Sequence, residues 1–156
     1  MRQRVAMATV AFVVAIAASA FAQKTDFSGS WTLDESASQL GGGGGGGRGM
    51  MAGPITVKQT ADTLSVERTI ADNKVTMNYK LDGTESRNTM IGRAGQSVDA
   101  TSVAKWEGPK LVITTKREMG GNVVETTETW SLANGVLTID SVGGRGPSKR
   151  VYKKTT

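Results

Sequence analysis

Apolar residues recur at every second position over most of the chain after Pro54, and this spacing is the strongest constraint on its fold. Val75, Met77, Tyr79 and Leu81 alternate with lysine, threonine and asparagine residues. Successive side chains of a β-strand point to opposite faces, so this period is typical of strands with one buried face and one solvated face. The sequence therefore predicts an all-β fold.

Short turn signals separate the alternating segments, among them Asp82-Gly83 and Asn134-Gly135. Neighbouring strands joined by hairpins favour an antiparallel up-and-down β-barrel of about eight to ten strands over a Greek-key sandwich, because closure removes the exposed sheet edges. The predicted strands span residues 27–33, 54–60, 63–70, 74–81, 85–91, 97–106, 110–117, 122–132, 136–141 and 148–154.

The first 22 residues are typical of a secretory signal peptide. Arg2 and Arg4 give a basic start, an uncharged apolar run follows, and Ala20-Phe21-Ala22 offers the small residues that a signal peptidase accepts. We predict cleavage after residue 22, so that residues 23–156 form the barrel domain and the protein is exported to the bacterial periplasm or beyond the cell, with no stable membrane span after cleavage. A retained membrane anchor is the alternative, because the apolar run borders on the length needed to span.

The chain of 156 residues contains neither His nor Cys. This excludes disulfides, thiolate nucleophiles, Ser-His-Asp triads, and zinc or copper sites that need imidazole or thiolate ligands. No paired carboxylates fix a mechanism, so we predict no enzymatic activity, no metal and no cofactor. The net charge of +5 comes from scattered basic residues, which gives no footprint for nucleic acid.

A glycine-rich segment interrupts the strand pattern at residues 41–49, where seven glycines precede Arg48 and Gly49. We predict a flexible connection between the first and second strands. The alternative, a phosphate-binding loop, would need a Gly-Lys-Ser/Thr ending and a strand that leads into a helix, and the sequence has neither.

Three motifs resemble those of the calycin barrels, the group of the lipocalins and the intracellular fatty-acid-binding proteins. Phe27–Leu33 resembles their Gly-x-Trp opening strand, Lys105–Leu111 resembles a Lys-Trp-Asp-Gly hairpin, and Arg150–Lys154 resembles the closing strand of the fatty-acid-binding proteins. The resemblance implies a lipocalin-like barrel. Fatty-acid-binding proteins insert a helical portal after the first strand, whereas residues 34–51 are rich in glycine here, so we expect no helical portal.

The inward face of each strand follows from the parity of its apolar residues, and polar residues on that face are the candidates for binding. Because a buried charge needs a partner, we expect an ion pair between the one carboxylate of this set and one of its arginines. The candidate ligand-binding residues are Arg68, Tyr79, Arg117 and Glu128, with Arg150 and Tyr152 if the closing strand turns that face inward.

Two further expectations concern the ends and the middle of the barrel. Trp31 should close one end beneath a cation-π contact from Arg150 or Lys149. In the middle, the small residues Ala100, Ser102 and Ala104 share one face and would leave volume for a ligand. The alternative is a solid barrel in which large neighbours fill that volume.

These features predict an exported carrier or sensor for a small amphiphilic or anionic ligand. An apolar cavity would take the tail, and arginine and tyrosine donors would bind the head group. The alternative is a ligand-free structural or interaction barrel of the bacterial envelope. The oligomeric state stays open.

Overall fold

Ten antiparallel strands make up most of the described part of the chain, and each lies where the alternation predicts it, with boundaries at most two residues away. The computed structural model describes residues 24–41, 53–70, 72–91, 96–144 and 146–155, so the predicted signal peptide and nearly all of the glycine-rich segment lie outside the described residues. The strands are β1 (Gly29–Leu33), β2 (Ile55–Gln59), β3 (Thr63–Ile70), β4 (Asn73–Lys80), β5 (Glu85–Ile91), β6 (Ser97–Glu107), β7 (Lys110–Met119), β8 (Asn122–Ala133), β9 (Val136–Gly143) and β10 (Gly146–Lys154).

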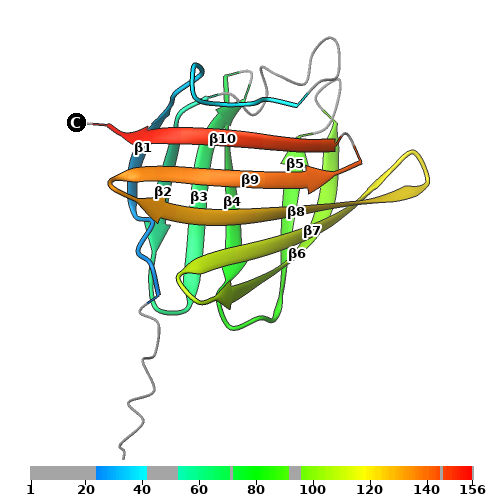
Figure 1. The fold of residues 1–156 in the computed structure, drawn as a ribbon. Coiled ribbons are helices and arrows are strands. Elements are labelled where there is room, and N and C mark those ends of the chain that lie inside the picture. The colour runs from blue at the N-terminus through cyan, green and yellow to red at the C-terminus, as the bar shows by residue number, and fades with distance from the viewer. Residues whose placement is uncertain (1–23, 42–52, 71, 92–95, 145, 156) are drawn as a thin grey trace, which may run out of the picture.

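The strands follow one another around a nearly closed barrel, in the order β4-β3-β2-β1-β10-β9-β8-β7-β6-β5. The first and last strands are neighbours in this order, because Trp31 of β1 pairs with Lys154 of β10, and Leu33 pairs with Tyr152. In Figure 1, β8, β9 and β10 run across the front of the molecule, and β2, β3 and β4 cross behind them. The predicted up-and-down barrel is confirmed.

Among the described residues, no helix is long and apolar enough to cross a membrane. The stretch after β1 that the structure describes, residues 34–41, contains a turn and an isolated bridge instead of a helix.

Side chains, and not a backbone ladder, close the barrel between β4 and β5. The Asn88 carboxamide accepts a hydrogen bond from the Asn78 amide at 2.8 Å and donates one to the Asn78 carbonyl at 2.9 Å. Two residues away along each strand, the Ser86 hydroxyl accepts a hydrogen bond from the Lys80 amide at 2.8 Å. Ser86 and Asn88 are buried, so these bonds satisfy backbone groups that would otherwise lack a neighbouring strand. We call this junction the β4–β5 seam.

The aromatic core begins before β1. The Phe27 ring stacks on Trp106 with centroids 6.0 Å apart and meets the Trp130 ring edge-on at 5.8 Å. The Gln59 side chain holds this segment, accepting a bond from the Phe27 amide at 3.0 Å and donating one to the Thr25 carbonyl at 2.9 Å. Phe27 therefore lies outside β1, two residues before the strand begins, because its amide bonds to a side chain.

Trp31 is buried, and its indole nitrogen donates a hydrogen bond to the Phe27 carbonyl at 3.0 Å. The cation over its ring is Lys154, whose ammonium lies 5.7 Å from the ring centroid. The prediction that Arg150 or Lys149 caps Trp31 was therefore wrong. The β1–β10 register explains the difference, because it places Lys154 directly opposite Trp31.

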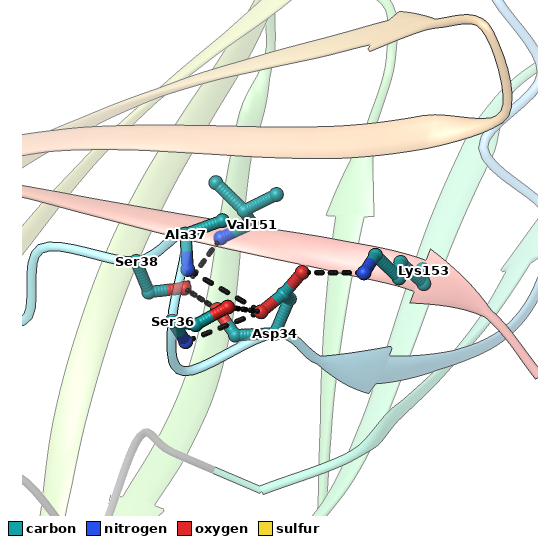
Figure 2. A network of polar contacts seen from close by, with 6 residues as sticks. All are labelled: Asp34, Ser36, Ala37, Ser38, Val151 and Lys153. Carbon is teal, nitrogen blue, oxygen red and sulfur yellow. Dashed lines mark hydrogen bonds and ion pairs between the residues drawn. The ribbon is translucent and has the colours of Figure 1, made fainter.

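A turn after β1 covers the outer face of β10 (Figure 2). The Asp34 carboxylate accepts bonds from the Ser36 hydroxyl at 2.6 Å and from the Lys153 ammonium at 2.7 Å. The Val151 amide donates to the Ser38 hydroxyl at 2.9 Å, and the Val151 carbonyl accepts from the Asp34 amide at 2.8 Å. Val151 is consequently buried on the outside of the barrel.

Asn88→Ala should lower the free energy of unfolding by about 1–3 kcal/mol, because it removes the partner of the part-buried backbone amide and carbonyl of Asn78. Urea denaturation measures this change. The control Arg87→Ala alters an exposed neighbour on the same strand and should change stability by less than about 0.5 kcal/mol. Equal stability of the two variants would contradict the role given to the β4–β5 seam.

Asp34 should contribute to the acid sensitivity of the fold. Hydrogen bonds from Lys153 and Ser36 lower the pKa of Asp34 from 3.8 to about 2. A carboxyl with a lowered folded pKa stabilises the protein above its unfolded pKa, and this contribution disappears as the pH falls from about 4 towards about 2.

Asp34→Asn should therefore lower stability at neutral pH and remove part of the stability change over that acid range, as measured by urea denaturation at several pH values. Glu35→Gln removes the adjacent carboxylate as a control. Parallel stability curves for wild type and Asp34→Asn across that range would show that the Asp34 contacts contribute nothing to folding.

Candidate functional site

A buried ion pair lies inside the barrel where β8, β9 and β10 run side by side. Glu128 of β8 bonds to the Nη2 group of Arg150 on β10, and the same Nη2 donates to the Ser141 hydroxyl of β9 at 3.2 Å. The Trp130 indole donates to the other oxygen of the Glu128 carboxylate at 3.2 Å. The predicted pairing of the one inward carboxylate with an arginine is confirmed, and the structure identifies that arginine.

Strand register explains why these side chains meet. Glu128 lies opposite Ser141, and Arg150 lies opposite Ile139, two residues along β9 on the same face. A long side chain reaches such a diagonal neighbour across a sheet. Burial of Arg150 and Tyr152 to 3% and 0% exposure confirms that this face of the closing strand points inward.

The charges of the pair stabilise one another. Burial alone would raise the pKa of Glu128, but the positive charges of Arg150 and Arg68, with hydrogen bonds from Arg150 and Trp130, outweigh it and hold the pKa below its ordinary value. Burial would likewise lower the pKa of Arg150, and Glu128 and the nearby tyrosines raise it instead. Both groups are therefore charged at neutral pH.

Two more predicted residues belong to the same electrostatic environment. Tyr79 on β4 is buried, and burial together with the charge of Glu128 raises the pKa of its phenol, against the opposing effect of Arg68 and Arg150. The phenol is therefore neutral at physiological pH. Arg68 on β3 is half-buried. It lies on the inward face of the strand, between the buried residues Val66 and Ile70.

Arg117 stands apart from this cluster. It lies opposite Ala100 of β6 and Val124 of β8. The residue of β7 that lies opposite Glu128 is Ile113, four residues away from Arg117. At the rise of a β-strand this separation is roughly 13 Å. The structure therefore brings together five of the six predicted residues and leaves Arg117 towards the β7–β8 hairpin.

The cluster contains two buried hydrogen-bonding atoms without partners. Within the described part of the chain, neither the Tyr152 hydroxyl nor the Nη1 group of Arg150 has a hydrogen-bond partner. Tyr152 acts electrostatically on Arg150, and the two residues share one face of β10. A buried polar group without a partner is costly, and these two atoms have hydrogen-bonding capacity that no described residue uses.

The small residues of β6 face inward as expected, since Ala100, Ser102 and Ala104 are all buried. The Ser102 hydroxyl lies 2.8 Å from that of Thr115 on β7. It therefore has a hydrogen-bond partner on the neighbouring strand. The predicted ligand cavity beside them stays a prediction.

Sequence reasoning missed Ser141 and the role of Trp130 as a hydrogen-bond donor. Ser141 shares the parity of Leu137 and Ile139, so the alternation carried a signal for it. The contact between Trp130 and Glu128 joins residues two apart on one face of β8, and that spacing was also visible in the sequence.

Solved structures with this architecture include a fatty acid transporter, a lipid binding protein and a fluorescent protein. A fatty acid transporter, REP1-NXSQ, matches 83% of this chain and 96% of its own at a TM-score of 0.61 and 15% identity. The apo lipid binding protein 8 of Caenorhabditis elegans matches 83% and 95% at 0.56 and 16%, and the fluorescent protein UnaG matches 83% and 97% at 0.60 and 21%. No protein-family model and no curated protein matches the sequence.

The fold is the antiparallel up-and-down β-barrel that these three proteins share. The three comparisons are each below 25% identity, so they establish the architecture that the terminal motifs predicted. The arrangement of this barrel's interior is a property of its own side chains.

Tyr152→Phe should leave the free energy of unfolding unchanged or raise it, because the substitution removes a buried hydroxyl that has no partner in the described structure. Urea denaturation of the ligand-free protein tests this. A loss above about 1 kcal/mol would show that the hydroxyl forms a stabilising bond in the folded protein.

Proposed function

We propose that this protein binds a small amphiphile inside its barrel and acts as an exported carrier or sensor for it, without enzymatic activity. The observation that carries the proposal is the pair of buried donor atoms, Tyr152 Oη and Arg150 Nη1, which lack partners in the described structure. They lie in a barrel whose other inward residues are mostly apolar. A ligand with a polar head and an apolar tail complements both features.

Two further observations support the proposal. The barrels with the same architecture include a fatty acid transporter and a lipid binding protein. The export part of the proposal rests on the sequence of residues 1–22, with its basic start, apolar run and small residues before the predicted cleavage position.

Native mass spectrometry of protein purified from its own host tests the proposal most directly. We expect a stoichiometric lipid that is removed by mild organic extraction. In extracted protein, a polarity-sensitive neutral dye such as Nile red should bind and be displaced by long-chain amphiphiles, and Tyr152→Phe should weaken that displacement by about twofold to tenfold, the range of one hydrogen bond.

A clean ligand-free mass, together with no dye binding that an amphiphile displaces, would overturn ligand binding. That outcome would agree with the alternative role as an interaction barrel of the bacterial envelope. The unfolding experiment on Tyr152→Phe separates weak binding from a damaged fold.

A further inference from the structure

We propose that the barrel has a second polar subsite, at Arg117, which binds an anionic oxygen group, so that the ligand is an amphiphile with a polar group at each end. This inference rests on the proposed function, because it names the class of ligand for the same barrel. It follows from the strand register around Arg117, from the partners that this arginine lacks, and from the exposure of the wall on which it lies.

A row of hydroxyl side chains crosses the inward face of the barrel next to Arg117. Ser102 of β6 lies opposite Thr115 of β7, and Thr115 lies opposite Thr126 of β8. Arg117 is two residues further along β7 on the same face, opposite the small residue Ala100. The register therefore gathers three hydroxyls and one guanidinium on adjacent strands. We call Ser102, Thr115, Thr126 and Arg117 the Arg117 subsite.

Arg117 lacks a counter-ion in the described part of the chain. Its Nε group is buried and has no hydrogen-bond partner there, and the ion pairs found among those residues do not include it. The inward carboxylate of β8, on Glu128, already bonds to Arg150 and to the Trp130 indole. An arginine that faces the interior without an anion beside it has an uncompensated charge, which an anionic group of a ligand would balance.

Water reaches the wall of the barrel that carries this subsite. Lower on β7, the inward residues Leu111 and Ile113 have an exposure of 0%. Thr115, Arg117 and Thr126 are partly exposed, although parity places them on the same inward face. A charged group can therefore contact Arg117 without losing all of its hydration, so the cost of transferring an ion from water is smaller here than in the fully buried core.

The hydroxyls can add donors to those of the guanidinium. The Ser102 and Thr115 hydroxyls lie 2.8 Å apart, and one of them donates to the other. A hydroxyl has one hydrogen, so the accepting hydroxyl keeps its own hydrogen for a further acceptor. Arg117 has donors only, and hydrogen bonds from a guanidinium to an anionic oxygen are stronger than those to a neutral one. The Arg117 subsite therefore favours a carboxylate, sulfonate or phosphate over an alcohol.

The Arg117 subsite is separate from the donors of the closing strand. Arg150 reaches Glu128, and the residue of β7 opposite Glu128 is Ile113. Ile113 is four residues from Arg117, which is roughly 13 Å along the strand. A ligand that satisfies both places needs two polar groups separated by a distance of this order. The chain between them would lie among the apolar residues that make up most of the core.

The test compares dodecanedioate with dodecanediol as competitors for bound Nile red, at about pH 7.5 where both carboxyl groups are ionised. The two ligands have the same chain and identical ends, so their orientation in the barrel does not affect the comparison. Arg117→Met should weaken dodecanedioate binding at least about fivefold and dodecanediol binding less than about twofold, because only the dianion loses a charge-assisted hydrogen bond.

Two control variants separate the site from the net charge. Arg87→Met removes an arginine from β5, but that side chain is 88% exposed and pairs with Glu85 at the surface, so both affinities should stay unchanged. Arg117→Lys keeps the positive charge without the planar fork of donors, and it should weaken dodecanedioate binding less than Arg117→Met does.

Arginine modification by phenylglyoxal keeps the inference testable on wild type should Arg117→Met fail to fold. Peptide mass mapping measures the modification rate of each arginine with saturating dodecanedioate and with saturating dodecanediol. Dodecanedioate should slow the modification of Arg117 at least about threefold more than dodecanediol does, because it bonds to the guanidinium directly. The rate at the exposed Arg87 should be the same with either ligand.

The inference is overturned if Arg117→Met changes the two affinities equally, or if dodecanedioate protects Arg117 no better than dodecanediol does. It is also overturned if wild type binds long-chain amphiphiles with one polar end but not dodecanedioate. Failure of the proposed function looks different, because no amphiphile of either kind would then displace the dye from wild type or from any variant.

Discussion

The ion pair of Glu128 and Arg150 is the interaction on which the interior depends. It links β8 to β10 across β9, with Ser141 in between, so three consecutive strands share one polar centre. A buried charge is tolerated only with a partner, and this requirement fixes what its neighbours must be. Trp130 is a donor there as well as a core residue, and Tyr79 contributes a phenol that stays neutral beside the carboxylate.

The barrel is closed in two different ways. At one place the first and last strands, β1 and β10, pair through their backbones, and the Asp34 turn covers the outside of β10. At the β4–β5 seam, closure depends on the side chains of Asn88 and Ser86. A backbone ladder tolerates most substitutions, because every residue supplies the same groups. The seam needs a carboxamide and a hydroxyl at two inward positions, so here the identity of the side chain maintains the closure.

The period-two pattern was sufficient to predict the strands, because each strand buries one face and alternation records that burial directly. It also predicted that Glu128 points inward and pairs with an arginine. It could not identify Arg150 as the partner, since that depends on the strand order and register, which bring β10 within two strands of β8. The cap on Trp31 was assigned to the wrong cation for the same reason. Lys154 lies opposite Trp31 only in the observed register.

The closing-strand motif predicts the direction of Arg150 but not its contact with Glu128. The Arg150-Val151-Tyr152 sequence predicts two inward donors, and the structure confirms their direction. A carboxylate two strands away in the sheet already bonds to one edge of the guanidinium. No linear motif contains that carboxylate. The surroundings of the guanidinium are therefore set by a contact between residues distant in the sequence, whereas its inward direction is set by the closing strand.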